Sequence, residues 1–218
     1  MRLLLAAGLA VLTIAATAPA DWTKRVTQTA QGAFVLGNPA AKTRLVEYVS
    51  YTCDHCARFV GEASAPLKAR VAKGGTAVEV RHAVRDPIDL SATLLARCTG
   101  PSRFFAAHEK LFATQDQWFA AGVRYAQANQ AALEKAAPAE RLKLLTRNAG
   151  LAAVVGLTPA QADACLANMA AHKPVLAMTD EAWRTRSIPG TPYFLINGQG
   201  ADGVTGWAAL EPKLTSSK

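Results

Sequence analysis

The stretch Cys53-Asp54-His55-Cys56 decides the fold prediction because of what lies on either side of it. It follows an apolar run, residues 45–51, that is typical of a buried strand, and it precedes a segment from Ala57 to about Lys73 that predicts a helix. A strand, a Cys-x-x-Cys motif and a helix in this order favour redox chemistry. Cys53 then lies at the helix N-terminus, where the macrodipole stabilises a thiolate and lowers the thiol pKa.

Two other functions of a Cys-x-x-Cys motif fit this chain poorly. A structural zinc site needs four ligands, and the other two cysteines, Cys98 and Cys165, are isolated in the sequence. A c-type haem site needs histidine directly after the second cysteine, where this chain has Ala57. The motif therefore predicts a redox disulfide, and we expect neither a metal nor an organic cofactor.

The N-terminus indicates the compartment. Arg2 precedes an apolar segment from Leu3 to Ile14, and Ala18-Pro19-Ala20 fits a small-x-small cleavage pattern, so residues 1–20 are expected to be a secretory signal peptide. The mature chain is then expected in the periplasm, an oxidising space in which disulfides persist. The chain of 218 residues has a formal net charge of +8, but its basic residues are scattered and do not indicate a nucleic-acid site.

The remaining patterns give the order of elements. Residues 44–51 are apolar on both faces apart from Glu47 and Ser50, which predicts a central strand. Residues 76–85 alternate as a second strand, and strand, helix, strand implies a parallel pair. From about Leu90 to Trp183 the periodicity is helical. Residues 193–196 return to a strand, Asn197-Gly198 predicts a hairpin, and residues 203–205 are expected to form its second strand.

Cys98 and Cys165 fall on two of the predicted helices in the middle of the chain. Two buried free thiols that behave as small apolar groups would satisfy the sequence. In an oxidising compartment a structural disulfide between them is favoured over that alternative.

A second motif, Gly190-Thr191-Pro192-Tyr193-Phe194-Leu195-Ile196-Asn197-Gly198, lies far downstream of the cysteines. Proline is tolerated at the first residue of a strand, and an X-Pro bond there can be cis. Together with residues 46–56, this motif resembles the DsbA-like thiol–disulfide oxidoreductases, along essentially the whole mature chain. The resemblance implies an α/β thioredoxin fold with an inserted all-helical domain. The expected division is 21–88 and 187–218 for the thioredoxin-like domain and 89–186 for the insertion.

The resemblance also implies roles for individual residues. Cys53 becomes the exposed nucleophile, Cys56 the buried resolving cysteine, and Pro192 the cis proline packed against their disulfide. Thr191 would offer its backbone to a client peptide as an added strand, with Asp54 also assigned to substrate binding. Glu47 would relay the proton of Cys56; its position inside so apolar a strand independently favours a function over a solvated edge carboxylate.

Two departures from the family pattern bear on the activity. The familiar oxidase pair between the cysteines is Pro-His, whereas this chain has Asp54-His55. His55 is expected to stabilise the Cys53 thiolate, and Asp54 to oppose it by like charge. The residue before the proline is Thr191, where the best-known oxidase has valine and where disulfide isomerases can also have threonine.

The sequence thus predicts a periplasmic oxidase that introduces disulfides into exported proteins. The expected partners are unfolded or reduced exported proteins and a membrane redox partner that reoxidises the enzyme, which is expected to be a monomer. A reductase or isomerase that uses the same residues is the first alternative. A chaperone or metal-binding module with a thiolate pair is the second.

Overall fold

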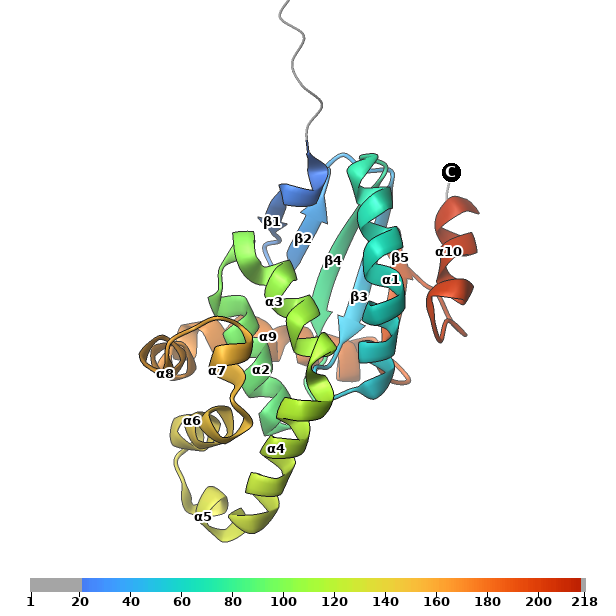
Figure 1. Ribbon diagram of the computed structural model, residues 1–218. Coiled ribbons are helices and arrows are strands. Elements are labelled where there is room, and N and C mark those ends of the chain that lie inside the picture. Colours follow the sequence, from blue (N-terminus) through green and yellow to red (C-terminus); the bar gives the residue numbers. More distant parts are fainter. Residues whose placement is uncertain (1–20, 217–218) are drawn as a thin grey trace, which may run out of the picture.

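The computed structural model describes residues 21–216, so the predicted signal peptide, residues 1–20, lies outside the described residues. A mixed sheet of six strands, in the order β1-β2-β4-β3-β5-β6, forms the centre of one half of the molecule (Figure 1). Its strands are β1 (Val26–Gln28), β2 (Phe34–Gly37), β3 (Thr43–Val49), β4 (Thr76–His82), β5 (Tyr193–Ile196) and β6 (Gln199–Gly200).

The sequence prediction of a central β3 is confirmed. β3 pairs in parallel with β4 and antiparallel with β5, so both of its edges are hydrogen-bonded. Its side chains are buried on both faces apart from Arg44, because helix α1 (Asp54–Ala72) packs on one face and the segment from Glu181 to Ile188 packs on the other. A strand buried on both faces needs a nearly continuous apolar sequence, which residues 45–49 supply apart from Glu47.

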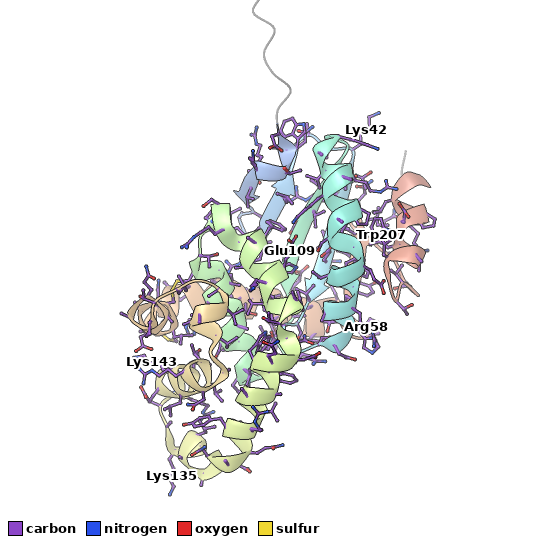
Figure 2. The ribbon with its side chains drawn as sticks, in the orientation of Figure 1. Lys42, Arg58, Glu109, Lys135, Lys143 and Trp207 are labelled. Carbon is purple, nitrogen blue, oxygen red and sulfur yellow. A yellow bond between two sulfur atoms is a disulfide. The ribbon has the colours of Figure 1, made fainter. Side chains whose placement is uncertain are left out.

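A set of helices is inserted between β4 and β5, as the sequence periodicity predicts (Figure 1). The inserted helices are α2 (Pro87–Cys98), α3 (Pro101–Ala113), α4 (Gln115–Ala128), α5 (Gln130–Lys135), α6 (Pro138–Ala149), α7 (Leu151–Val154), α8 (Pro159–Ala167), α9 (Met169–Asp180) and the π-helical turn η2 (Glu181–Thr185). Lys135 and Lys143 lie on the part of the insertion farthest from the sheet (Figure 2). The expected fold class, a thioredoxin fold with an inserted all-helical domain, is correct.

The chain ends beside α1. Helix α10 (Trp207–Ser216) packs along the outer side of α1, where the backbone N–H of Trp207 contacts the Glu62 carboxylate at 3.4 Å (Figure 2). A short 3₁₀ turn, η1 (Trp22–Lys24), precedes β1 at the other end of the described chain. No helix of residues 21–216 is both long and apolar enough to cross a membrane.

Two predicted strands differ from the observed ones. The second strand of the hairpin is formed by Gln199–Gly200 and not by residues 203–205, because Asn197 and Gly198 both adopt positive φ and turn the chain back at once. β4 ends at His82 and not at residue 85, because Asp86 already caps α2: its carboxylate accepts from the backbone N–H groups of Ile88 and Asp89.

A disulfide joins Cys98, at the end of α2, to Cys165 in α8. The two cysteines are 67 residues apart in the sequence, and the bridge lies wholly within the insertion. Cys165 is buried, whereas Cys98 is exposed. The bridge therefore holds together helices that chain connectivity alone would leave free to separate.

The Cys98→Ala/Cys165→Ala double variant is expected to be less stable than the parent protein. Closing a loop of this length lowers the entropy of the unfolded chain, and loss of the closure costs about 4 kcal/mol at most in the chain-entropy model. Denaturant unfolding of both proteins, with Cys53 and Cys56 held in the same redox state, measures the difference. Equal midpoints and slopes would contradict the expected contribution.

Candidate functional site

The loop of residues 50–53 carries the first cysteine from the end of β3 to the start of α1 (Figure 1). Cys53 is the N-cap residue of α1: its backbone is extended and its carbonyl accepts from the N–H of Ala57 at 3.2 Å. The unpaired N–H groups of the first helical turn and the helix macrodipole therefore lie next to the Cys53 sulfur. Cys56 lies one turn into the helix on its buried side.

The two thiols are free in this structure and differ strongly in acidity. A hydrogen bond from the Cys56 thiol lowers the pKa of Cys53 most, and the charge of Arg85 adds to the effect, so this pKa falls to about 5. Burial raises the pKa of Cys56 well above its usual value, and its bond to Cys53 raises it further. The pair thus contains one thiolate and one thiol at neutral pH.

The expected exposure of Cys53 is wrong. Only 2% of the residue is accessible, against 0% for Cys56. The segment before β5 lies against the Cys53 sulfur, which as a thiol donates to the Thr191 carbonyl at 3.1 Å. A partner must therefore approach Cys53 past this segment.

Thr191 and Pro192 immediately precede β5, and the peptide bond between them is cis. The Thr191 carbonyl contacts Cys53, which brings together two motifs that are 138 residues apart in the sequence. The Thr191 hydroxyl oxygen is buried and has no hydrogen-bond partner. The structure thus assembles Cys53, Cys56, Thr191 and Pro192 in one place.

His55 and Asp54 are exposed in the first turn of α1, and both contact Arg58. The Asp54 carboxylate lies 3.8 Å from the Arg58 guanidinium, and Nη2 of Arg58 donates to Nδ1 of His55. His55 and Asp54 thus share one cationic neighbour, Arg58, at the exposed start of α1. Arg58 lies near the end of α1 that holds the cysteines, whereas Lys42 lies near the other end of this helix (Figure 2).

A cavity of about 450 Å³ lies beside this cluster. Its lining consists of His55, the segment 189–193 and the segment 201–205. Thr191 and Pro192 are part of this lining, and the Thr191 carbonyl contacts the Cys53 sulfur. A group bound in the cavity therefore lies beside the segment that contacts Cys53.

Glu47 lies in the middle of β3, opposite Val80 of β4 and Phe194 of β5. Its residue is 3% exposed, and its Oε1 has no hydrogen-bond partner. Burial raises the pKa of Glu47 to about 8, so the carboxyl group is largely protonated at neutral pH. A cavity of about 40 Å³ between α1, α3 and the sheet joins Glu47 to His108 and to the more exposed Glu109.

The Glu47→Gln variant is expected to change how stability depends on pH. In the parent protein an unfolded carboxyl group ionises near 4.5 whereas the folded one stays protonated to about 8. Stability is therefore fully present below pH 4.5 and falls by about 1.4 kcal/mol per pH unit up to pH 8. Glutamine has nearly the same shape and no charge, so the variant loses this slope.

Denaturant unfolding at several pH values between 4 and 8 checks this prediction. Glu140→Gln, at an exposed position in α6, is the matched control and should follow the parent profile. A Glu47→Gln profile with the parent slope would mean that the folded carboxyl group ionises as freely as an exposed one.

Sequence reasoning missed four residues, in the insertion or just before it, that hold the cysteine loop. Asp89 accepts from Ser50 Oγ at 2.6 Å and from the Tyr51 N–H at 2.8 Å, and Asp86 accepts from Thr52 Oγ1 at 2.6 Å. Arg85 donates to the Thr52 carbonyl, and Gln115 donates to the Tyr51 carbonyl. Asp86-Pro87-Ile88-Asp89 has the pattern of an ordinary helix start, and nothing in the sequence marks Gln115. In the described part of the chain, no three His, Cys, Asp or Glu side chains gather as a metal site.

Comparison with known proteins agrees with this site. The model of the thioredoxin family matches residues 29–214. A structure named as a protein-disulfide isomerase from Novosphingobium aromaticivorans is similar, with 39% identity, a TM-score of 0.77, and coverage of 84% of this chain and 95% of that one. The Wolbachia pipientis alpha-DsbA1 structure shares the fold, with 21% identity, a TM-score of 0.65, and coverage of 86% of this chain and 92% of that one.

Curated relatives from Rickettsia carry a provisional name, protein-disulfide oxidoreductase. The Rickettsia conorii protein is 30% identical over 166 residues, or 75% of this chain and 53% of the relative. The chain thus spans about half the length of the curated relatives it matches. A family match over most of the chain, a Cys-x-x-Cys pair at the start of α1 and a proline before β5 lead to one conclusion: the chain belongs to the thioredoxin family, with a helical insertion between β4 and β5.

Proposed function

We propose that this protein catalyses thiol–disulfide exchange through Cys53 and Cys56 and acts as an oxidase that donates a disulfide to client proteins. The acidity difference within the pair carries the proposal: the pKa of Cys53 is about 5, whereas that of Cys56 is raised well above its usual value. A thiol of low pKa leaves readily and favours the reduced state of its own disulfide.

The reaction proceeds in two displacements. A client thiolate attacks the Cys53 sulfur of the Cys53–Cys56 disulfide, a client–Cys53 disulfide forms, and Cys56 leaves and takes up a proton. A second client thiolate then attacks the client sulfur of this mixed disulfide, and Cys53 leaves as a thiolate. The two client thiols have lost two electrons and two protons, and the Cys53–Cys56 disulfide has been reduced to a thiolate and a thiol.

Five residues assist these steps in the proposal. Glu47, protonated and buried below the site, supplies the proton that Cys56 takes up and removes it again on reoxidation. The backbone at Thr191 pairs with an extended client segment, and Pro192 keeps the Thr191 carbonyl against Cys53. Client side chains enter the cavity lined by His55 and residues 201–205, and Asp54, exposed beside His55 in the sequence, is also assigned to client binding.

The setting of the activity is also part of the proposal. The predicted signal peptide and the Cys98–Cys165 disulfide support a periplasmic protein whose clients are unfolded or reduced exported proteins. An oxidase must be reoxidised after each turnover, which a membrane redox partner would do. We propose that the enzyme works as a monomer.

Disulfide isomerisation is the second candidate function. Two observations favour it: Thr191 before the proline, and the similarity to a structure named as a protein-disulfide isomerase. An isomerase needs its Cys53 thiolate free to attack a wrong client disulfide, whereas an oxidase needs the Cys53–Cys56 disulfide.

Two client substrates distinguish these functions. A reduced client is mixed with the oxidised protein, and a client with scrambled disulfides is mixed with the reduced protein, with Cys53→Ser as the inactive control in both. Rapid stoichiometric oxidation of the first client with little rescue of the second supports the oxidase. Efficient rescue of the scrambled client with slow donation to the reduced one supports the isomerase instead.

A further inference from the structure

The loop before α1 has its backbone carbonyls held by side chains from the start of α4 and from the segment between β4 and α2. Gln115, the first residue of α4, donates from Nε2 to the carbonyl of Tyr51 at 2.7 Å and to that of Cys53 at 3.0 Å. Arg85, just before α2, donates from Nη2 to the carbonyl of Thr52 at 2.5 Å. Three consecutive carbonyls thus accept from two side chains, one at the start of α4 and one just before α2.

Asp89 fixes the same loop and Arg85 together. Its carboxylate accepts from the backbone N–H of Tyr51 at 2.8 Å and from that of Arg85 at 3.0 Å. Asp89 is fully buried, so these contacts are shielded from water and held with little freedom. Asp89 therefore links the backbone of Arg85 to the backbone of Tyr51, two residues before Cys53.

The Arg85 guanidinium is the cation of this arrangement. In residues 21–216 no carboxylate lies within ion-pair distance of it, whereas Arg81, four residues earlier, is paired with Glu79 and Glu181. Its positive charge is held one residue from Cys53 and is not neutralised by a direct partner.

We propose that Arg85 is a positioning residue for the redox pair: Arg85, Asp89 and Gln115 hold the Cys53 loop, and the Arg85 charge stabilises the Cys53 thiolate. The inference rests on the proposed role of Cys53 as the nucleophile. The Arg85 charge is also among the causes that lower the pKa of Cys53. Residues in the insertion and just before it then set the reactivity of a cysteine that belongs to the thioredoxin-like part.

Two substitutions separate the charge of Arg85 from its hydrogen bond. Arg85→Gln keeps an N–H donor but removes the charge, and Arg85→Lys keeps the charge. The rate of alkylation of Cys53 in the reduced protein, followed from pH 3 to pH 8, gives the midpoint of its ionisation. We expect this midpoint to rise by about half a unit to one unit in Arg85→Gln and by clearly less in Arg85→Lys.

The equilibrium with glutathione gives a second readout. A rise of one unit in the Cys53 pKa destabilises the reduced protein at neutral pH, so the exchange constant should shift up to about tenfold toward the disulfide form. Arg141→Gln is the matched control. Arg141 also donates to a backbone carbonyl, that of Leu133 at 2.7 Å, but at the far end of the insertion, so its loss should lower stability without moving the Cys53 midpoint.

A midpoint and a glutathione equilibrium that both stay unchanged in Arg85→Gln would overturn the proposal, whatever happens to the melting temperature. Equal shifts in Arg85→Gln and Arg85→Lys would also overturn it, because the charge would then not be the cause. If Arg85→Gln does not fold, the Arg85→Lys midpoint decides: a value within about half a unit of the parent supports the role of charge, and a larger rise contradicts it. These readouts need no client, so they remain decisive even if the protein proves not to be an oxidase.

Discussion

Replacement of Cys56 by serine is expected to give a protein that accumulates mixed disulfides through Cys53, whereas replacement of Cys53 by serine should give none. At pH 6, a Cys53 thiol with a pKa of about 5 is about 90% thiolate. Cys56 has a pKa well above 9, so its thiolate fraction at the same pH is below about one part in a thousand. Thiolate is the attacking form, so only Cys53 starts the exchange.

The expected difference survives the lower nucleophilicity of an acidic thiolate. Nucleophilicity falls with pKa at a Brønsted slope of about 0.4–0.5, which over four units removes less than the gain in thiolate population. Once the mixed disulfide has formed, only the Cys56 sulfur lies close enough within the chain to displace the client. Without it the adduct persists.

Both variants should be incubated at pH 6 with a disulfide-bonded client, and the adducts should be mapped by mass spectrometry after separation without reductant. The peptides that contain Cys98 and Cys165 provide the internal control, because their disulfide should remain unmodified. Similar amounts of adduct on both variants would show that Cys53, the more acidic cysteine, is not more reactive than Cys56.

The second large effect concerns the stability of the two redox states as pH changes. The reduced protein should gain stability over the oxidised one by about 1.4 kcal/mol per pH unit between pH 5 and pH 9, or about 3–4 kcal/mol from pH 5 to pH 8. For a domain of this size that corresponds to roughly 10 °C in melting temperature. The cause is the Cys53 thiolate, which exists only in the reduced protein.

The direction follows from the two pKa values of Cys53. The folded pKa of about 5 lies below the ordinary value of 9.0, so the folded reduced protein releases its proton first. The stabilisation is fully present above pH 9 and is lost as the pH falls through 5. Glu47 titrates in both redox states, so its contribution largely cancels from the difference. The short loop closed by the disulfide favours the oxidised protein by about 2 kcal/mol at every pH and does not affect the slope.

Unfolding by denaturant, at one-unit steps from pH 5 to pH 8, measures the difference between the two states. A mild reductant should open Cys53–Cys56 and leave Cys98–Cys165 closed, which thiol counting must verify. A reduced protein that is the more stable one at pH 8, with the expected slope, supports an oxidase. A flat difference, or an oxidised protein that is clearly more stable at pH 8, removes that support and favours the reductase.

Much of the fold could be predicted because the strongest patterns are local. The apolar run of β3, the turn Asn197-Gly198 and the helical periodicity of the insertion each depend on residues close together in the sequence. The hairpin strand after Gly198 was placed wrongly because a two-residue strand has too few side chains to show an alternation. The parallel pairing of β3 with β4 followed from the strand, helix, strand order of the sequence.

The candidate site could be predicted only as far as the two motifs reach. Cys53, Cys56, Thr191 and Pro192 meet as expected, whereas the burial of Cys53 depends on how closely the segment before β5 lies against its sulfur. The contact of His55 with Arg58 could not be predicted, because Arg58 is one of several basic residues with no distinguishing pattern. Gln115 supports two carbonyls of the loop, and such tertiary hydrogen bonds leave no periodic trace in a sequence.

The place of β5 beside β3 has a consequence for how the chain reaches its folded state. Tyr48 pairs with Tyr193, so one edge of the central strand has no partner until the last part of the chain has been made. Closing so long a loop is entropically slow, and meanwhile all four cysteines, which allow three pairings, are present in the emerging chain. Until Thr191 reaches Cys53, the contacts of β5 cannot favour Cys56 over Cys98 or Cys165 as the disulfide partner of Cys53. A chain truncated before residue 190 should therefore form disulfides that mix the two pairs, and completion of the last strand is the event that ends the competition.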